Sequence, residues 1–400
     1  MKFSVDTNQF KKNLIKLRED LNKTLEDGKL KENFKDQLLE VEEKEKTILR
    51  ELLPYYRLYA PDIYETKINI LPVKMEGTYE FNSYLKSYLE VEKDIFIFAG
   101  SDLKMYFARI LDRQDGKIEL SPAIKDFKKL VIAIYPLDKD QTLVFTASGQ
   151  IFVFSCKDIK DVFENINNLK INKIDKDFES FENVIKLDEN KFICQTAKDQ
   201  LILLEINRAD LRFEIKSEIS LSDLVDEIRY LVKISRSKFA IATSSGDFLQ
   251  VKVQENQIDI EEKIKILDGP INKLEILENE NSDRKTCAIL GNQGRLILYD
   301  LERKEIKKSE KELKGDLFNI KTNEGTAIIL TADGFLYLFE ENFGEWKVNS
   351  KISQDDIFLM NLVVLDPSNY LGLDLDGNFY ILKIDRLNSI EKLYDLDLYK

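Results

Sequence analysis

The chain has 400 residues, of which 43% are hydrophobic, and a formal net charge of −13 at pH 7 without a single histidine. This length and apolar content are enough for one large core and a smaller extra module. The acidic balance argues against non-specific binding to nucleic acid, which needs a basic surface. The lack of histidine excludes Ser-His-Asp and Cys-His catalysis and any metal site that uses histidine.

No run of eighteen or more apolar residues occurs, so no membrane-spanning helix is expected. The first residues, MKFSVDTNQFKK, lack the apolar core of a signal peptide, and we therefore expect a cytoplasmic protein. Three cysteines are present, and Cys194 and Cys287 fall within strand-like runs. We expect them, with Cys156, to be small buried core residues rather than disulfides or metal ligands.

Residues 1–53 predict a helical hairpin. Apolar residues recur at steps of three and four on both sides of Asp27-Gly28, and Pro54 follows the second run, which is typical of two amphipathic helices joined by a turn. Two such helices cannot bury their apolar stripes alone. The stripe either braces the rest of the chain or binds a partner protein or a second copy, as a coiled coil would. Its length favours a partner surface formed by Phe10, Leu14, Leu17, Leu21, Phe34, Leu38, Val41 and Ile48.

Residues 54–65 form a predicted linker, and residues 66–400 contain seven copies of one pattern: an apolar run, a tight polar turn and an alternating apolar run. The aligned turn positions are 47, 50, 47, 48, 40 and 43 residues apart, a period typical of a β-propeller. The turns are Asp102, Gly149, Asp199, Gly246, Gly294, Gly334 and Gly377. The copies read IFIFAGSDLKMYF, LVFTASGQIFVF, FICQTAKDQLILL, FAIATSSGDFLQV, CAILGNQGRLILY, AIILTADGFLYLF and LGLDLDGNFYILK.

Each copy is interpreted as the inner hairpin of a propeller blade. Its β-branched and aromatic residues suit strands that are buried on both faces. Glycine at the turn permits the positive φ of a tight hairpin, and aspartate at positions 102 and 199 tolerates the same conformation. One strand precedes each hairpin and a more charged strand follows it, so four strands per copy predict seven blades and a mostly β fold.

A strand-like segment at the start of the propeller indicates how the ring closes. Thr66–Val73 is strand-like but has no hairpin before it, and we interpret it as the outer strand of the last blade. Ser389–Tyr399 competes for the same place because it directly follows the seventh hairpin. One segment closes the blade, and the other extends or covers it.

The repeat resembles that of the tryptophan–aspartate (WD) repeat propellers over roughly residues 66–400. The best match is GRLILYDLERKE at Gly294–Glu305, where Tyr299-Asp300 occupies the Trp-Asp position. The only tryptophan, Trp346, lies in a predicted outer strand, and without histidine the hydrogen-bonded tetrad of that family cannot form. The resemblance implies the fold and a bias toward protein-binding scaffolds, while the function depends on the site.

The turns predict an acidic rim at one end of the propeller, because equivalent turns point the same way. It comprises Asp102, Asp199, Asp247, Asp333, Asp374 and Asp376. The leading interpretation is a non-enzymatic scaffold or regulatory subunit of a cytosolic multiprotein complex, with protein partners, no cofactor, no bound metal, no nucleic acid and no membrane contact. The alternative is a propeller enzyme or ligand-binding protein that uses carboxylates, and a divalent cation, at the central channel.

The two interpretations of the helical stripe predict different outcomes for Leu17→Asp combined with Leu38→Asp. If the stripe binds a partner, the double variant loses complex formation and keeps its melting temperature, because the buried charge costs desolvation only in the complex. Size-exclusion chromatography and thermal unfolding test this. A large fall in melting temperature with association intact identifies the stripe as a brace instead.

Overall fold

The computed structural model describes residues 67–385, except for positions 77–78, 82, 125–126, 128, 175–177, 279–284, 309–312, 324, 343–344 and 354–356. The predicted helical hairpin, the linker and the competing segment Ser389–Tyr399 lie outside these residues. Thr66–Asp385 forms one compact unit.

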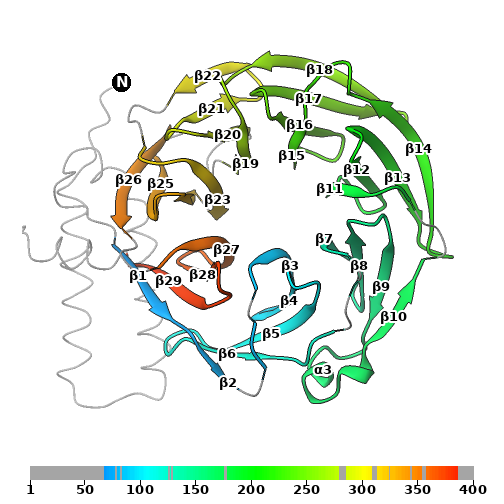
Figure 1. Cartoon of the computed structure of the whole chain (residues 1–400), viewed down its shortest axis with the longest axis vertical. Helices are drawn as coiled ribbons and strands as arrows, with labels where there is room; N and C mark the ends of the chain where they lie inside the picture. The colour runs from blue at the N-terminus through cyan, green and yellow to red at the C-terminus, as the bar shows by residue number, and fades with distance from the viewer. Residues whose placement is uncertain are drawn as a thin grey trace, which may run out of the picture. The chain divides into compact units, whose positions relative to one another are not determined.

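Within the described residues, the strands form seven sheets around a central opening, so the predicted seven-bladed propeller is confirmed (Figure 1). The first strand of each blade lines the opening and the fourth lies outermost. The hairpins of the repeat are therefore the second and third strands, and the strand before each hairpin is the innermost one.

Each blade is built in chain order from its innermost strand outward. Blade 1 contains β3 (Leu85–Glu92), β4 (Ile95–Gly100), β5 (Met105–Asp112) and β6 (Lys117–Leu120); blade 2 contains β7 (Val131–Asp138), β8 (Gln141–Thr146), β9 (Ile151–Ser155) and β10 (Lys170–Lys173); blade 3 contains β11 (Phe181–Lys186), β12 (Lys191–Thr196), β13 (Gln200–Asn207) and β14 (Arg212–Ser220); blade 4 contains β15 (Ile228–Lys233), β16 (Lys238–Thr243), β17 (Asp247–Gln254) and β18 (Gln257–Lys265). Blade 5 contains β19 (Ile271–Glu278), β20 (Lys285–Gly291), β21 (Leu296–Asp300) and β22 (Glu305–Lys308); blade 6 contains β23 (Leu317–Asn323), β24 (Thr326–Thr331), β25 (Phe335–Asn342) and β26 (Glu345–Ser353); blade 7 contains β27 (Leu359–Asp366), β28 (Asn369–Asp374) and β29 (Phe379–Asp385).

The core of the propeller lies between blades rather than within one sheet. Seven apolar clusters are formed by the described residues, and each joins two neighbouring blades. Phe145 of β8 and Phe192 of β12, for example, lie with their ring centroids 5.2 Å apart across the boundary between blades 2 and 3. Cys194 and Cys287 are buried free thiols in two of these clusters, as predicted, whereas Cys156 is only partly buried. Because both faces of each blade are covered, the middle strands are apolar on both sides.

The last blade is completed by β1 (Lys67–Pro72), which pairs with β29 over its whole length, from Lys67 opposite Asp385 to Pro72 opposite Tyr380. This confirms the prediction that Thr66–Val73 supplies the missing outer strand. The chain then continues into β2 (Lys74–Glu76), which pairs in parallel with β6 and gives blade 1 a fifth strand. The sequence did not indicate this extra strand. Consecutive residues thus hold the last and the first blade together.

An ion-pair cluster also joins blades 7 and 1. It lies at the end of the propeller where the first and second strands of each blade are connected. Arg113 donates from Nε to Asp94 of blade 1 at 2.8 Å and forms an ion pair with Asp366 of blade 7. The three side chains are only a quarter to a third exposed. A guanidinium that binds two carboxylates stabilises the fold more at such a partly buried position than it would at the open surface, where water screens the ion pairs.

Every innermost strand starts with the same irregularity. In all seven described blades the register with the second strand shifts between the first and third residues, as at Leu85/Ser87 and Leu317/Asn319. A β-bulge leaves backbone groups of the ladder without partners. Amide side chains of the preceding blade bind several of them: Asn272 donates to the carbonyl of Leu317, Asn319 to that of Met360, Asn361 to that of Leu85 and Gln195 to that of Ile228, at 2.6–3.0 Å.

One helical insertion was not predicted. Between β9 and β10 the chain forms the short helix α3 (Asp161–Glu164) and the 3-10 turn Ile166–Asn168. Val162 is fully buried there, and Phe163 packs edge-on against Phe107 of blade 1. The insertion covers the apolar boundary between blades 1 and 2, but it is too short to produce a helical period in the sequence.

The hairpin turns adopt the predicted left-handed conformation at all five glycines, with φ from +70° to +94°, and at Asp199 with φ 53°. In the first hairpin the residue with positive φ is Leu103 rather than Asp102. Asp102 instead accepts a hydrogen bond from the hydroxyl of Tyr106, at 3.0 Å, which holds the turn from outside.

Two turn glycines form a matched pair for substitution. A Cβ at Gly294 would lie 1.6 Å from the carbonyl oxygen of Leu313, whereas the nearest atom to a Cβ at Gly334 is the ring of Phe358 at 3.9 Å. Their φ angles are +70° and +74°, so the left-handed strain of an alanine is the same at both. That strain costs about 1–2 kcal/mol.

We expect Gly334→Ala to cost about that amount and Gly294→Ala to cost roughly 1–3 kcal/mol more, because backbone must move to make room. Urea unfolding followed by intrinsic fluorescence measures both. Equal losses of stability in the two variants would contradict the predicted collision.

Candidate functional site

The seven hairpin turns and the first residues of the innermost strands lie at the same end of the propeller. The pairing shows this, since the first residue of each innermost strand lies opposite the end of the second strand, as Leu85 does with Gly100 and Leu317 with Thr331. The segments that enter the innermost strands therefore approach from this end as well. We call this surface the turn face.

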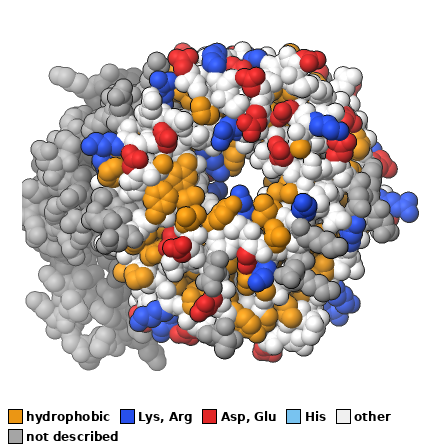
Figure 2. All heavy atoms as spheres, viewed as in Figure 1, with side chains coloured by type: hydrophobic (Ala, Val, Ile, Leu, Met, Phe, Trp, Pro, Cys, Tyr) orange, Lys and Arg blue, Asp and Glu red, His pale blue; other side chains and the backbone are white. Residues whose placement is uncertain are grey.

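An apolar patch lies on the turn face over blades 6 and 7. Phe318 is the bulged second residue of β23, and Phe358 directly precedes β27; their rings are stacked, with centroids 6.2 Å apart and an interplanar angle of 17°. Phe358 is 39% exposed and Leu375, in the turn of blade 7, is 55% exposed. With Met360, the bulged residue of β27, these three residues define the apolar patch. Figure 2 shows hydrophobic side chains gathered beside the central opening over β23, β25 and β27.

The bulges explain the partial exposure of Phe318 and Met360. In a regular ladder the second residue of the innermost strand would face a neighbouring blade, but the extra residue of the bulge turns it toward the end of the ring. Phe318 and Met360 consequently remain partly exposed, although their flanking residues Leu317 and Leu359 are buried. Stacked aromatic rings that stay exposed at the end of a propeller offer a preformed apolar contact.

An acidic group lies on the same face over blades 3 and 4. It consists of Glu182, the bulged residue of β11, Asp199 in the turn of blade 3, and Glu227, which precedes β15. Glu182 is exposed as a residue, but partial desolvation of its carboxylate, followed by the nearby charges of Asp199 and Glu227, raises its pKa above the usual range. Asp199 accepts from the backbone N–H of Ile228 at 3.0 Å. Figure 2 shows acidic side chains over β11 and β15, across the opening from the apolar patch.

The opening itself is lined by polar side chains of both signs. The Nζ of Lys273 lies 4.2 Å from the centroid of the Tyr230 ring, and the Nζ of Lys321 lies 5.6 Å from that of Tyr88 on blade 1. Tyr88, ahead of Glu275, raises the pKa of Lys321 despite the opposing effect of burial. Lys321 is therefore a fixed positive charge inside the ring, which is unfavourable for binding a cation there.

The predicted acidic rim divides into two kinds of residue. Four carboxylates accept hydrogen bonds from neighbouring residues: Asp102 from Tyr106, Asp199 from Ile228, Asp247 from Ser245, and Asp374 from Asn378 and Tyr380. Asp247 also forms an ion pair with Lys263. Asp333 and Asp376 are exposed. Over the described residues, no group of three or more Asp, Glu, Cys or His side chains is arranged to hold a metal ion.

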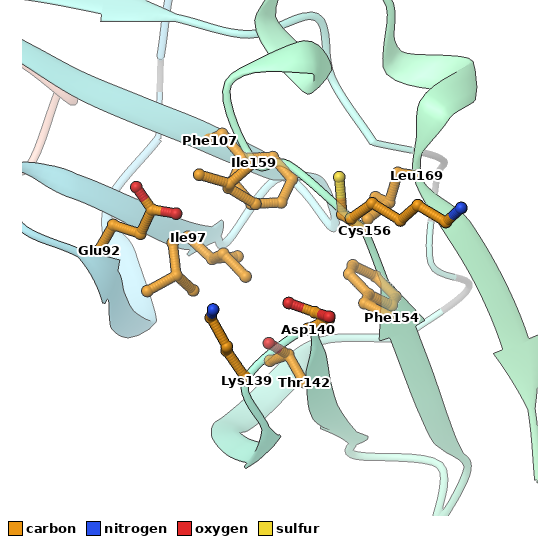
Figure 3. A pocket seen from close by; sticks show the side chains of 12 residues that line it. Glu92, Ile97, Phe107, Lys139, Asp140, Thr142, Phe154, Cys156, Ile159 and Leu169 are labelled. Carbon is orange, nitrogen blue, oxygen red and sulfur yellow. The ribbon is translucent and has the colours of Figure 1, made fainter.

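A small cavity lies away from the turn face, beneath the helical insertion (Figure 3). It has a volume of about 50 Å³ and is lined by apolar residues such as Phe107, Phe154 and Ile159, with Lys139, Asp140 and Glu92 at its edge. Cys156 also lines it, and its thiol lies 2.9 Å from the carbonyl oxygen of Asp158. Pockets for small-molecule ligands usually measure about 300–1,000 Å³, so this cavity has room for one or two waters only.

Sequence reasoning identified Asp199 but missed Phe318, Phe358, Met360, Glu182 and Glu227. Phe318 and Met360 occupy strand positions that look like core, and only the bulge exposes them. One feature of the sequence could have indicated their exposure. The second residue of the innermost strand is charged in some blades and apolar in others, whereas a core position would be apolar in all of them. The predicted partner residues Phe10 to Ile48 lie outside the described part of the chain.

Asp374 and Asp376 in the turn of blade 7 test whether the rim aspartates are structural. Asp374 is buried and accepts from the backbone N–H groups of Asp376 and Asn378, the amide of Asn378 and the hydroxyl of Tyr380. Burial, followed by the hydrogen bond to Asp374, raises the pKa of Tyr380 to about 12. We expect Asp374→Ala to destabilise the fold by about 1–3 kcal/mol, since several donors lose their acceptor.

Asp376→Ala keeps the backbone donor and removes an exposed carboxylate, so its effect should stay within about 0.5 kcal/mol. Thermal and urea unfolding of the two variants measure the difference. A loss for Asp376→Ala as large as that for Asp374→Ala would contradict the structural role assigned to Asp374.

Comparison with known proteins supports the fold alone. No protein-family model matches the chain, and no curated protein matches it by sequence. Among solved structures, the chain is similar to Sqt1 of Saccharomyces cerevisiae, with a TM-score of 0.57 and 9% sequence identity over 79% of this chain and 99% of that one. No helix in the described part of the chain is long and apolar enough to span a membrane. The chain is thus a seven-bladed propeller whose fold is shared with a solved protein of very different sequence.

Proposed function

We propose that this protein is a non-enzymatic interaction subunit, a scaffold or regulator within a cytoplasmic multiprotein complex, and that its propeller is a diverged relative of the WD-repeat type. The observation that carries the proposal is the apolar patch on the turn face. The stacked pair Phe318 and Phe358, with exposed Leu375 beside it, concentrates large apolar side chains next to the mouth of the channel.

The chemistry of the described residues supports binding over catalysis. The channel carries Lys273 and Lys321 beside Glu275, and the buried carboxylates of the turns accept hydrogen bonds from their own hairpins. Catalysis would require acid, base or nucleophilic groups that converge on a bound substrate. Interfaces instead use rigid aromatic anchors surrounded by polar residues, which is the arrangement around Phe318 and Phe358.

The test is co-purification of tagged full-length protein from its native host, with the bound proteins quantified. We expect Phe358→Ser to reduce the recovery of a specific partner by about tenfold, since a buried aromatic anchor contributes roughly 2 kcal/mol or more to binding. Ile306→Ser on the outer strand β22 is the matched control, because Ile306 is similarly exposed, at 48%, but lies away from the turn face.

Both variants should keep the melting temperature of the parent protein within a few degrees, which separates lost binding from lost folding. The proposal fails if the wild-type protein has no stoichiometric partner. It also fails if the two serine variants retain the partner equally.

A further inference from the structure

The turn face carries two chemically different surfaces on opposite sides of the channel mouth. The apolar patch belongs to blades 6 and 7, and the acidic group belongs to blades 3 and 4, which lie on the other side of a ring of seven. Both surfaces are built in the same way, from a bulged second residue of an innermost strand, a neighbouring turn and the residue that enters the next strand. Their spacing is therefore fixed by the ring itself.

From these positions we propose that the turn face binds an extended segment of a partner protein, which packs an apolar side chain on the apolar patch and directs Lys or Arg side chains to the acidic group across the channel mouth. This inference rests on the proposed function and specifies the chemistry of the partner.

The acidic group has acceptor capacity that the fold does not use. Glu182 accepts from the amide of Gln195 through Oε2, and Asp199 uses Oδ1 for Ile228 and for a long contact to the same amide. The hydrogen bonds of these two carboxylates thus involve one oxygen each. Glu227 is exposed, and among the described residues none forms an ion pair with it. Charged donors of a partner could therefore bind the remaining oxygens of these carboxylates.

Electrostatics favours a cation at this position. Beyond the effect of desolvation, the charges of Asp199 and Glu227 raise the pKa of Glu182, so a bound positive charge would relieve this repulsion. Two exposed basic residues lie next to the acidic group along the chain. Lys198, adjacent to Asp199, forms an ion pair with Glu179 at 3.1 Å, and Arg229, the bulged residue of β15, makes no ion pair with the acidic group in the described structure. A protein of net charge −13 also attracts basic segments at long range.

The remaining observations select a polypeptide as the occupant. A bare metal ion is disfavoured, because the described carboxylates form no metal-binding group, and a nucleic acid is repelled by the acidic surface. An apolar anchor separated from basic side chains by a polar stretch is the pattern that a single peptide chain supplies without a folded domain. A segment that crosses the mouth would also approach the polar lining of the channel.

The experiment uses the full-length protein and a fluorescein-labelled peptide with Lys and Arg at one end, a Gly-Ser spacer, and Leu and Phe at the other end. Fluorescence anisotropy measures its affinity. A second peptide with Glu in place of every Lys and Arg is the probe control. We expect the basic peptide to bind and the acidic peptide to show no saturable binding.

Two double variants separate a local acidic contact from general attraction by net charge. Glu182→Gln with Glu227→Gln removes two charges of the acidic group and leaves Asp199 in place to hold Ile228. Glu218→Gln with Asp259→Asn removes two charges from exposed positions on the outer strands β14 and β18. We expect the first pair to weaken peptide binding by about tenfold or more and the second pair by less than about twofold.

Equal weakening by the two pairs would reduce the contact to non-specific electrostatics and overturn the inference. So would a basic peptide that does not bind, or one whose affinity is unchanged by Phe358→Ser. The natural partner distinguishes the two proposals. If Phe358→Ser releases that partner but the Glu182 and Glu227 double variant retains it fully, the proposed function stands and the inference is wrong.

Discussion

The antiparallel pairing of β1 with β29 is the contact on which the rest of the ring depends. A propeller of separate blades has no covalent continuity between its last and first members, and an unclosed ring would expose an edge strand and one face of a blade. Here a six-residue ladder closes blade 7, β2 immediately joins blade 1, and Arg113 and Asn361 add contacts across the same seam. Closure therefore fixes the relative positions of both surfaces on the turn face.

The amide contacts between blades show how the ring is stiffened without the histidine-containing tetrad of WD repeats. Each bulge frees a backbone carbonyl near the start of an innermost strand, and in four blades an Asn or Gln of the preceding blade binds it. Such a bond is worth about 0.5–1.5 kcal/mol, and leaving the carbonyl unpaired would cost more. Since the acceptor is backbone, the contact places no demand on the side chain of the accepting residue. Blades of very different sequence can therefore share one geometry.

The sequence predicted the parts of the fold that are repeated, and it missed the parts that depend on contacts between distant segments. The period of the turns was enough for the hairpins, the number of blades and the closing role of residues 66–73, because alternation and turn chemistry are local. The parallel strand β2 and the helix α3 are too short to carry a period. The site was harder to predict, because a one-residue bulge leaves Phe318 partly exposed at a position that would otherwise belong to the core, and the amino-acid composition does not reveal a bulge. Asp374 was placed on the predicted acidic rim, yet its oxygens accept hydrogen bonds from its own turn and from Tyr380.

The pairing of Lys67 with Asp385 makes the two ends of the ring cross-strand neighbours, with Cα atoms about 4.5–5.5 Å apart. The arrangement of the blades therefore does not depend on which strand comes first in the sequence. A short linker between these ends and a new start in a connection elsewhere, such as the one between β19 and β20, would give a circular permutant with the same seven interfaces. The seven interfaces between blades thus depend on the closed ring and not on where along the ring its first strand lies.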